Sequence, residues 1–216
     1  MIKKILPYLC TTMKGIKNII FDLGGVIINI NYQLTYKAFE DLGVKDFTSL
    51  YNQFTVSSLF GDLEIGKIGK ADFLEAMLQH TPAGTTHQQI TDAWNAMLLD
   101  FPLRNLQILQ QLRQHYNLYL LSNTNIIHLE AFNKILQDSR GIPSLAAFFD
   151  KAYYSHEIGL RKPEKEAYQF VLDENGLEPA ETLFIDDTLP NVEGAKVTGI
   201  QTIHLLPPKK LSDIFR

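Results

Sequence analysis

Short apolar runs alternate with amphipathic segments along most of the chain. Five runs have the length and the β-branched or aromatic content of buried strands. These runs lie at residues 16–21, 118–121, 149–154, 182–185 and 201–205. Between the later runs apolar residues recur at helical spacing, and Pro102, Pro163 and Pro190 stand where three helices would begin. Strand–helix alternation of this kind predicts an α/β fold, a Rossmann-like parallel sheet with helices on both faces.

A long helical segment interrupts this alternation after the first predicted strand. From about residue 32 to residue 99 apolar residues follow helical spacing, with turn signals at residues 66–69 and 81–84. We therefore expect a small helical bundle inserted into the α/β core. The positions that predict its second helix are Leu50, Phe54 and Leu59.

These patterns divide the chain into three parts. The predicted α/β core comprises residues 15–30 and 101–216, and the inserted helical bundle comprises residues 31–100. Residues 1–14 form an N-terminal extension, and the Pro207–Pro208 pair begins a polar tail.

Composition and charge narrow the class of protein. The 216 residues are 45% hydrophobic and 20% charged, which is ordinary for a globular chain. The net charge of −4 gives no general attraction to nucleic acid or to an anionic membrane. The single cysteine, Cys10, excludes an internal disulfide, and no apolar run approaches the ~18–20 residues of a membrane span. We expect a soluble, cytoplasmic protein that binds neither nucleic acid nor membrane, and Met13 is an alternative start of the chain.

One carboxylate directly follows the first predicted strand. A carboxylate within a buried strand is costly unless it finds a partner, so we place Asp22 at the strand's C-terminal end. Open α/β sheets bind ligands at that edge. Gly24 and Gly25 allow a sharp turn or a close approach to a ligand. An ordinary strand–turn with a solvated aspartate explains this stretch equally well.

Three further polar stretches follow later predicted strands. Ser122 and Asn123 offer a hydroxyl group and backbone N–H groups to an anion, or they belong to a plain helix cap. Lys162 offers a point charge to a phosphate, or it is a surface lysine. Asp186 and Asp187 repel each other unless a cation or a helix N-terminus compensates them. Their oxygen atoms suit Mg²⁺, and a helix cap is the alternative.

Together, these four stretches resemble the four sequence motifs of the haloacid dehalogenase (HAD) superfamily, in the same order. The resemblance extends from about Gly15 to Leu206, and the helical insert resembles the C1-type cap domain of that superfamily. It is closer to the sugar-phosphate phosphatase branch, which includes bacterial α-D-glucose-1-phosphate phosphatases. The stretches that carry it are residues 21–24, 64–68, 121–125, 161–164 and 186–187.

The resemblance implies a phosphatase that hydrolyses a small phosphomonoester, a sugar phosphate, through an aspartyl-phosphate intermediate. Asp22 would be the nucleophile, and Lys162, the Ser122 hydroxyl and the Asn123 N–H would hold the phosphoryl oxygens. The cofactor would be Mg²⁺. Its ligands would be Asp22, the Gly24 carbonyl, Asp186 and Asp187, with Asp187 the preferred direct ligand of the pair. The implied partner is a small phosphorylated metabolite, and the protein would be a monomer or a homodimer.

The chain departs from the superfamily pattern at one position. Most phosphatases of the superfamily carry a second aspartate, a general acid and base, where this chain has Gly24, although the sugar-phosphatase branch also has glycine there. Either the leaving group needs little protonation, or a residue of the cap supplies the missing general acid. Glu64 is the candidate for that residue. Trp94 and Asn95 are candidates for the substrate side of the cap, although a tryptophan at Trp94 is more typical of a bundle core.

Two other functions fit the same motifs. One is a catalytically weak HAD-like regulatory or binding protein that retains the site. The other is a 2-haloacid dehalogenase, in which the aspartate attacks carbon and no metal is needed. The Asp186–Asp187 pair argues against a dehalogenase, because uncompensated carboxylates would repel a haloacid.

Overall fold

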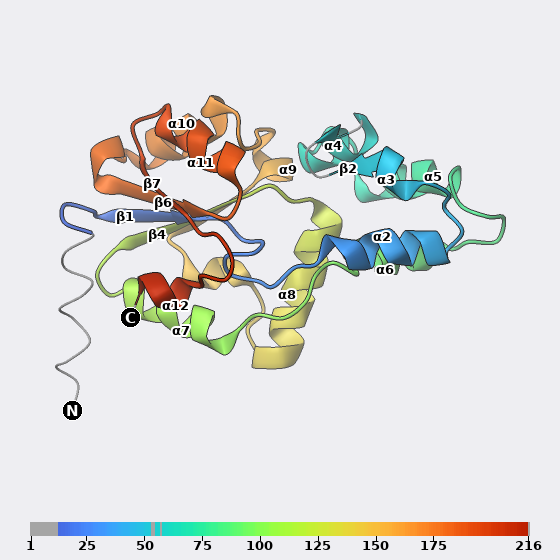
Figure 1. The fold of residues 1–216 in the computed structure, drawn as a ribbon, viewed down its shortest axis with the longest axis horizontal. Coiled ribbons are helices and arrows are strands. Elements are labelled where there is room, and N and C mark those ends of the chain that lie inside the picture. The colour runs from blue at the N-terminus through green and yellow to red at the C-terminus, as the bar shows by residue number, and fades with distance from the viewer. Residues whose placement is uncertain (1–12, 53–54, 57, 216) are drawn as a thin grey trace.

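The chain folds into an α/β core and a smaller, mainly helical lobe beside it (Figure 1). The structure is a computed structural model that describes residues 13–52, 55–56 and 58–215. Most of the predicted N-terminal extension, including Cys10, therefore lies outside the described residues.

Five parallel strands form the sheet of the core, in the order β5-β4-β1-β6-β7. Phe21 in β1 pairs with Leu120 in β4 and with Ile185 in β6, so the first strand occupies the centre of the sheet. The predicted parallel sheet is confirmed. Its strands are β1 (Asn18–Phe21), β4 (Asn117–Ser122), β5 (Lys151–Tyr154), β6 (Thr182–Asp186) and β7 (Gln201–His204).

Helices cover both faces of this sheet, as predicted (Figure 1). Ile19 and Phe21 point to one face and Ile20 points to the other, because successive side chains of a strand alternate. The helices that pack on the first face are α7 (Leu103–Leu112), α8 (Ile126–Arg140) and α12 (Leu211–Ile214). Those on the second face are α10 (Lys165–Asn175) and α11 (Leu189–Lys196). The short helices of the connections are η1 (Leu145–Phe148), α9 (Ser155–Ile158) and η2 (Pro179–Glu181).

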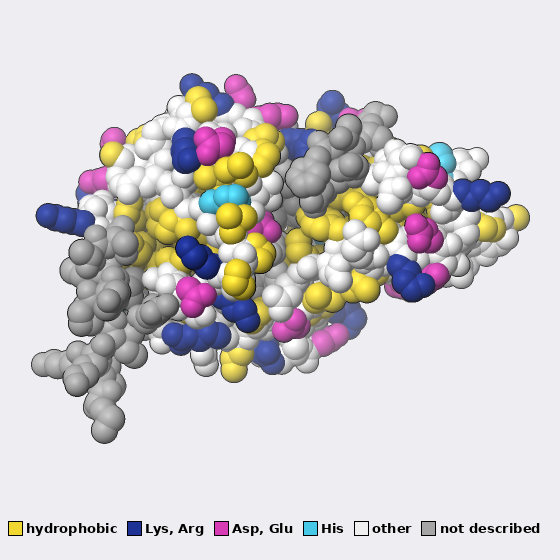
Figure 2. Space-filling view, in the orientation of Figure 1, with side chains coloured by type: hydrophobic (Ala, Val, Ile, Leu, Met, Phe, Trp, Pro, Cys, Tyr) yellow, Lys and Arg dark blue, Asp and Glu magenta, His cyan; other side chains and the backbone are white. Residues whose placement is uncertain are grey.

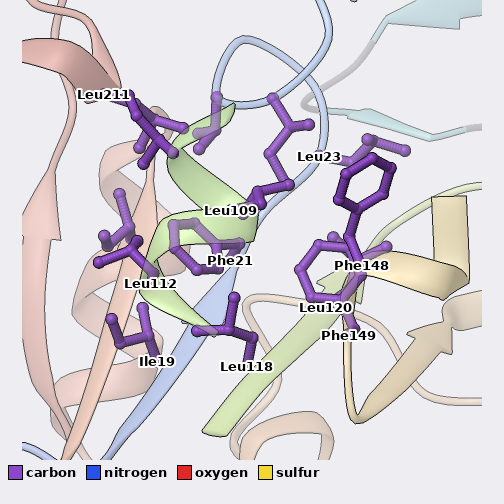
Figure 3. Packing of buried hydrophobic residues seen from close by; sticks show 14 of the residues in the cluster. Ile19, Phe21, Leu23, Leu109, Leu112, Leu118, Leu120, Phe148, Phe149 and Leu211 are labelled. Carbon is purple, nitrogen blue, oxygen red and sulfur yellow. The ribbon is translucent and has the colours of Figure 1, made fainter. Parts of the chain in front are cut away.

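The end of the chain belongs to the core and is not a polar tail. Phe21 lies at the centre of a cluster to which α7 and α12 contribute leucine side chains (Figure 3). Its ring centroid is 6.3 Å from that of Phe215, and Leu211 is buried in the same cluster. The prediction of a polar tail was wrong because two apolar residues on a single helical turn are too few to reveal a period.

The second lobe contains five helices among the described residues, and one prediction within it was wrong. The expected helix through Leu50 and Leu59 is interrupted by an antiparallel pair, β2 (Tyr51–Asn52) and β3 (Thr55–Val56). Phe54 lies outside the described residues. A two-residue strand pair is shorter than a helical period, so spacing could not reveal it. The helices are α2 (Tyr32–Asp41), α3 (Phe47–Leu50), α4 (Ser58–Glu64), α5 (Lys70–Leu78) and α6 (His87–Asn95).

Two adjacent linkers join the lobes. Asn29 accepts a backbone hydrogen bond from Leu99 and donates one to Asp100, both at 3.0 Å. Away from these linkers, the turn at Gly66 packs on the core: a Cβ atom there would lie 2.0 Å from the carbonyl oxygen of His156. A glycine with a φ of 71° is therefore required at this contact between the lobes.

The second lobe has its own apolar centre, distinct from the clusters on the two faces of the sheet. Its buried aromatic residues are Phe39, Phe47, Phe60, Phe73 and Trp94. The ring centroids of Phe39 and Phe47 are 4.1 Å apart in a stacked arrangement.

The surface carries charges of both signs. On the face shown in Figure 2, lysine and arginine side chains are interspersed with aspartate and glutamate. Within the described part of the chain, no helix combines the length and the apolar character needed to cross a membrane.

Replacing Phe215 by alanine should lower the free energy of unfolding by about 3–5 kcal/mol, because the substitution leaves a cavity against Phe21. Urea unfolding would measure this loss. Leu206→Ala is the matched control, since Leu206 is 52% exposed and its truncation should cost less than about 0.5 kcal/mol. Equal effects of the two substitutions would show that α12 does not stabilise the core.

Candidate active site

A cavity of about 340 Å³ opens between the carboxyl edge of the sheet and the helical lobe. Open α/β sheets bind their ligands at this edge. The core contributes Asp22, Gly24, Asn123, Thr124, Lys162 and Asp187 to its wall. The helical lobe contributes Tyr32, Tyr51, Phe60, Glu64, Trp94 and Met97.

Lys162 is a buried cation and not a surface lysine. Its side chain is 1% exposed, and its Nζ donates to Asp22 Oδ1 at 2.5 Å and to Asp186 Oδ2 at 2.8 Å. Burial by itself would lower the pKa of Lys162, but the carboxylates of Asp186 and Asp22 raise it above its usual range. Lys162 therefore stays charged and links the ends of the two neighbouring strands β1 and β6.

Asp186 is fully buried and accepts hydrogen bonds on both oxygens. Besides Lys162, it receives the backbone N–H of Thr188 at 2.8 Å and the Asn191 side-chain amide at 3.0 and 3.2 Å. Asn191 was not identified from the sequence as a site residue. The sequence feature that could have identified Asn191 is its position, in the first turn of the helix that follows the Asp186–Asp187 pair. With its oxygens occupied in this way, Asp186 serves to hold Lys162 in place.

Asp22 lies at the end of β1, as predicted, and it is 8% exposed. Burial raises the pKa of Asp22 from 3.8 to about 7, while Lys162 opposes this shift and the nearby Asp186 and Asp187 add to it. A carboxylate in this setting is ionised at neutral pH only in part. Added positive charge beside it would complete the ionisation that a nucleophile requires.

Asp187 is the more accessible carboxylate of the pair and lies against the turn after β1. A Cβ atom on Gly25 would be 2.2 Å from Asp187 Oδ2, so only glycine, here with a φ of 70°, allows this approach. Burial and the adjacent Asp186 raise the pKa of Asp187. The Gly24 carbonyl accepts no hydrogen bond within the described part of the chain and lies on the cavity wall with Asp187.

The donor set fits a divalent cation with oxygen ligands. One carboxylate oxygen from each of Asp22, Asp186 and Asp187 lies within 4.8 Å of the others. With all three carboxylates ionised, the cluster would hold two more negative charges than the ammonium group of Lys162 offsets, which matches the charge of Mg²⁺. Oxygen ligands in small number, with room for water and phosphate, are the usual environment of that ion.

Asn123 and Ser122 occupy different environments at the end of β4. The Asn123 side chain forms two hydrogen bonds with the backbone of Lys162, at 2.8 and 2.9 Å, so it positions the lysine loop. The Asn123 backbone N–H forms no hydrogen bond with another described residue and remains available for an anion. Ser122 is 3% exposed and is not among the residues that line the cavity. The helix cap that follows is Asn125, which accepts from the backbone of the first turn of α8.

Glu64 reaches the cavity from α4 and forms an ion pair with Arg161, which precedes Lys162. The distance from Arg161 to Glu64 Oε2 is 3.2 Å, and the two side chains are 25% and 18% exposed. Burial raises the pKa of Glu64, and Arg161 opposes this shift. This pair joins the two lobes across the cavity, and Arg161 was not singled out by sequence reasoning.

Trp94 belongs both to the core of the helical lobe and to the cavity wall. It is 3% exposed among the aromatic residues of the helical lobe, and it also lines the cavity. Asn95 does not line the cavity but hydrogen-bonds His128 of α8. His128, Tyr32 and Tyr51 on the cavity wall were not identified from the sequence, because none of them belongs to a motif.

Comparisons with known proteins agree on one family. A family model described as haloacid dehalogenase-like hydrolase matches residues 16–199. D-ribitol-5-phosphate phosphatase of Bacteroides thetaiotaomicron is 33% identical over 189 residues, which is 88% of this chain and 91% of that protein.

Two solved structures are similar over nearly the whole chain. A HAD family enzyme from B. thetaiotaomicron, in complex with magnesium and inorganic phosphate, superposes with a TM-score of 0.85 at 34% identity, covering 93% of this chain and 100% of that one. A predicted HAD-like family hydrolase from Porphyromonas gingivalis superposes with a TM-score of 0.80 at 33% identity, covering 90% and 92% of the two chains.

Without metal, Asp22→Asn should stabilise the protein increasingly as pH rises from about 4 to about 7. The folded protein holds a proton on Asp22 more tightly than the unfolded chain, because the folded-state pKa of Asp22 is raised from 3.8 to about 7. The stability that this proton contributes is therefore fully present below pH 3.8 and is lost as pH rises through about 7. The free energies of unfolding of wild type and variant should diverge by at most about 1.4 kcal/mol per pH unit.

Urea unfolding in EDTA across this pH range measures the divergence. Asp41→Asn, at a 63% exposed side chain on α2 that pairs with Lys37 at 2.8 Å, is the surface control. A constant difference between Asp22→Asn and wild type at all pH values would contradict the raised pKa. Addition of Mg²⁺ should reduce the difference.

Proposed function

The chain belongs to the haloacid dehalogenase-like hydrolase family, and from that premise we propose that it is a Mg²⁺-dependent phosphatase of a small sugar phosphate or sugar-alcohol phosphate. The observation that carries this proposal is the bridging of Asp22 and Asp186 by the buried Lys162, with Asp187 beside them on the wall of a cavity. A nucleophile, a fixed cation and a set of metal ligands therefore share one edge of the sheet.

In the proposed reaction Asp22 attacks phosphorus and forms an aspartyl-phosphate. The bond from phosphorus to the leaving-group oxygen breaks, that oxygen takes up a proton, and water then hydrolyses the acyl phosphate. Lys162 and the free N–H of Asn123 hold the phosphoryl oxygens, with the Ser122 hydroxyl proposed as a third donor. Asp22, the Gly24 carbonyl, Asp187 and Asp186 would hold Mg²⁺, which would supply positive charge to offset the repulsion between carboxylate and phosphate.

We propose Glu64 as the source of the proton for the leaving group. The position two residues after Asp22 is Gly24, which has no acid to offer. Glu64 lies on the cavity wall, and burial raises its pKa, so it retains a proton at higher pH than an exposed glutamate. Arg161 lies 3.2 Å from Glu64 Oε2, and this contact persists when the other oxygen carries the proton, so it fixes the direction of the carboxyl group.

The same proposal assigns a different role to each lobe. Residues 15–30 and 101–216 would form the phosphoryl-transfer core, and residues 31–100 the cap that selects the substrate. The separate apolar centres and the two hydrogen-bonded linkers support this division. We also propose that the protein acts in the cytoplasm, as a monomer or a homodimer, on a small phosphorylated metabolite.

Asp22→Asn should lower kcat on every accepted substrate by about a thousandfold or more, because an amide does not form an acyl phosphate. The assay is phosphate release from a panel of sugar phosphates, nucleotides and acyl phosphates, with Mg²⁺ and with EDTA. EDTA should abolish the wild-type activity, and Asp41→Asn should leave it unchanged. Residual activity of Asp22→Asn near wild type would overturn the mechanism.

Two other outcomes of this screen would support the competing functions. EDTA-resistant turnover of a haloacid would favour a dehalogenase. If wild-type protein with Mg²⁺ turned over no phosphomonoester, and Asp22→Asn changed nothing, a regulatory or binding role would be favoured.

Glu64→Gln should lower kcat on sugar phosphates by about 10²-fold or more, and on p-nitrophenyl phosphate by less than about fivefold. Only the poor leaving group needs a proton during bond cleavage. Steady-state kinetics on both substrates give the comparison. Asp62→Asn, on the same helix and ion-paired to Lys67 at 3.6 Å, is the control. An equal loss on both substrates would assign Glu64 to positioning and not to proton transfer.

A further inference from the structure

A histidine of the core and a tryptophan of the cap share one part of the cavity wall. His128 lies in the first turn of α8, and its backbone N–H donates to the Asn125 side chain at 3.1 Å. The helix begins directly after the loop that carries Asn123, so His128 is held at a fixed place relative to the phosphate-binding groups. Trp94, from α6, stacks on the imidazole ring with centroids 4.9 Å apart and planes inclined by 16°.

The hydrogen bonding of His128 determines which of its nitrogen atoms is free. Nδ1 lies 2.8 Å from Asn95 Oδ1, and a carboxamide oxygen can only accept, so Nδ1 carries the hydrogen. Burial lowers the pKa of His128 to about 3, which keeps the ring neutral. Nε2 is then an acceptor, and it forms no hydrogen bond with any described residue. The ring lies on the cavity wall that also contains Asp22.

Trp94 presents the complementary group. Its indole Nε1–H is buried and forms no hydrogen bond within the described part of the chain. A buried donor without a partner is costly, and native structures rarely tolerate one unless water or a ligand satisfies it. Most of the rings packed on Trp94 are apolar ones, from Phe39, Phe60 and Phe73, which offer the N–H no strong acceptor.

A hydroxyl group can donate one hydrogen bond and accept another, and the two stacked rings carry one unpaired acceptor and one unpaired donor. Resting on the proposed phosphatase function, we propose that His128 and Trp94 form a subsite for a hydroxyl of the leaving group. His128 Nε2 accepts from that hydroxyl, and the Trp94 indole donates to it or to its neighbour. Asn95 is a positioning residue that fixes the tautomer of His128. The substrates are accordingly phosphomonoesters of polyhydroxylated alcohols, and simple alkyl phosphates are poor substrates.

The test compares two substrates with the same kind of leaving oxygen, a pentitol 5-phosphate and n-pentyl phosphate. His128→Phe keeps a ring against Trp94 but removes the acceptor. It should lower kcat/KM for the pentitol phosphate about 10- to 100-fold, the range for one lost hydrogen bond to a buried polar group, and change that for pentyl phosphate by less than about threefold. His128→Gln, whose amide can reach the position of Nε2, should recover part of the loss. Asn95→Ala should produce a smaller loss on the pentitol phosphate alone.

Two controls separate the subsite from folding and from the phosphatase function. His87→Phe, at a 46% exposed histidine on the cap helix that carries Trp94, should leave the ratio of the two kcat/KM values unchanged. Thermal unfolding should show His128→Phe to be folded at the assay temperature. Equal losses on both substrates, or no loss on either, would overturn the subsite. Failure of wild-type protein with Mg²⁺ to hydrolyse acetyl phosphate and both esters would instead overturn the proposed function on which the subsite rests.

Discussion

The buried ammonium group of Lys162 is the interaction on which the rest of the structure depends. A charge that is 1% exposed is tolerated only if its hydrogen atoms meet charged partners, and Asp22 and Asp186 provide them from adjacent strands. Each partner must be held in turn: Asn191 binds Asp186, and Asn123 binds the backbone of Lys162. The parallel register of β1 and β6 thus determines where the charges meet.

The same cluster contains more negative than positive charge. This imbalance lowers the stability of the metal-free protein and favours the binding of a cation. Lys162 neutralises one of the three carboxylates that converge there, and burial raises the pKa of Asp22. A cation would complement such a site because it adds positive charge. A phosphoryl group would complement it because its oxygens can accept from the ammonium group of Lys162. A metal-free protein therefore carries local repulsion that a purely structural salt bridge would avoid.

Two pairs of polar side chains connect the two lobes. Arg161 pairs with Glu64 across the cavity, and His128 of the core pairs with Asn95 of the cap. Both pairs join residues that are far apart in the chain, and in both the core partner lines the cavity. Any rotation of the cap about its linkers would separate these two pairs while the contacts of Lys162 with Asp22 and Asp186 stayed intact.

The sequence by itself determined the parallel sheet, the inserted helical lobe and the positions of Asp22, Asp186 and Asp187 at strand ends. These features depend on local periodicity and on the cost of burying charge, which a linear pattern records. Only the tertiary structure decided that Leu211 and Phe215 complete the core, that Asn191 supports Asp186, and that His128 meets Trp94 and Asn95. The contacts of Phe215 and His128 join distant segments, for which no spacing along the chain exists. Asn191 is close to Asp186 in the chain, but their hydrogen bond depends on the turn between β6 and α11.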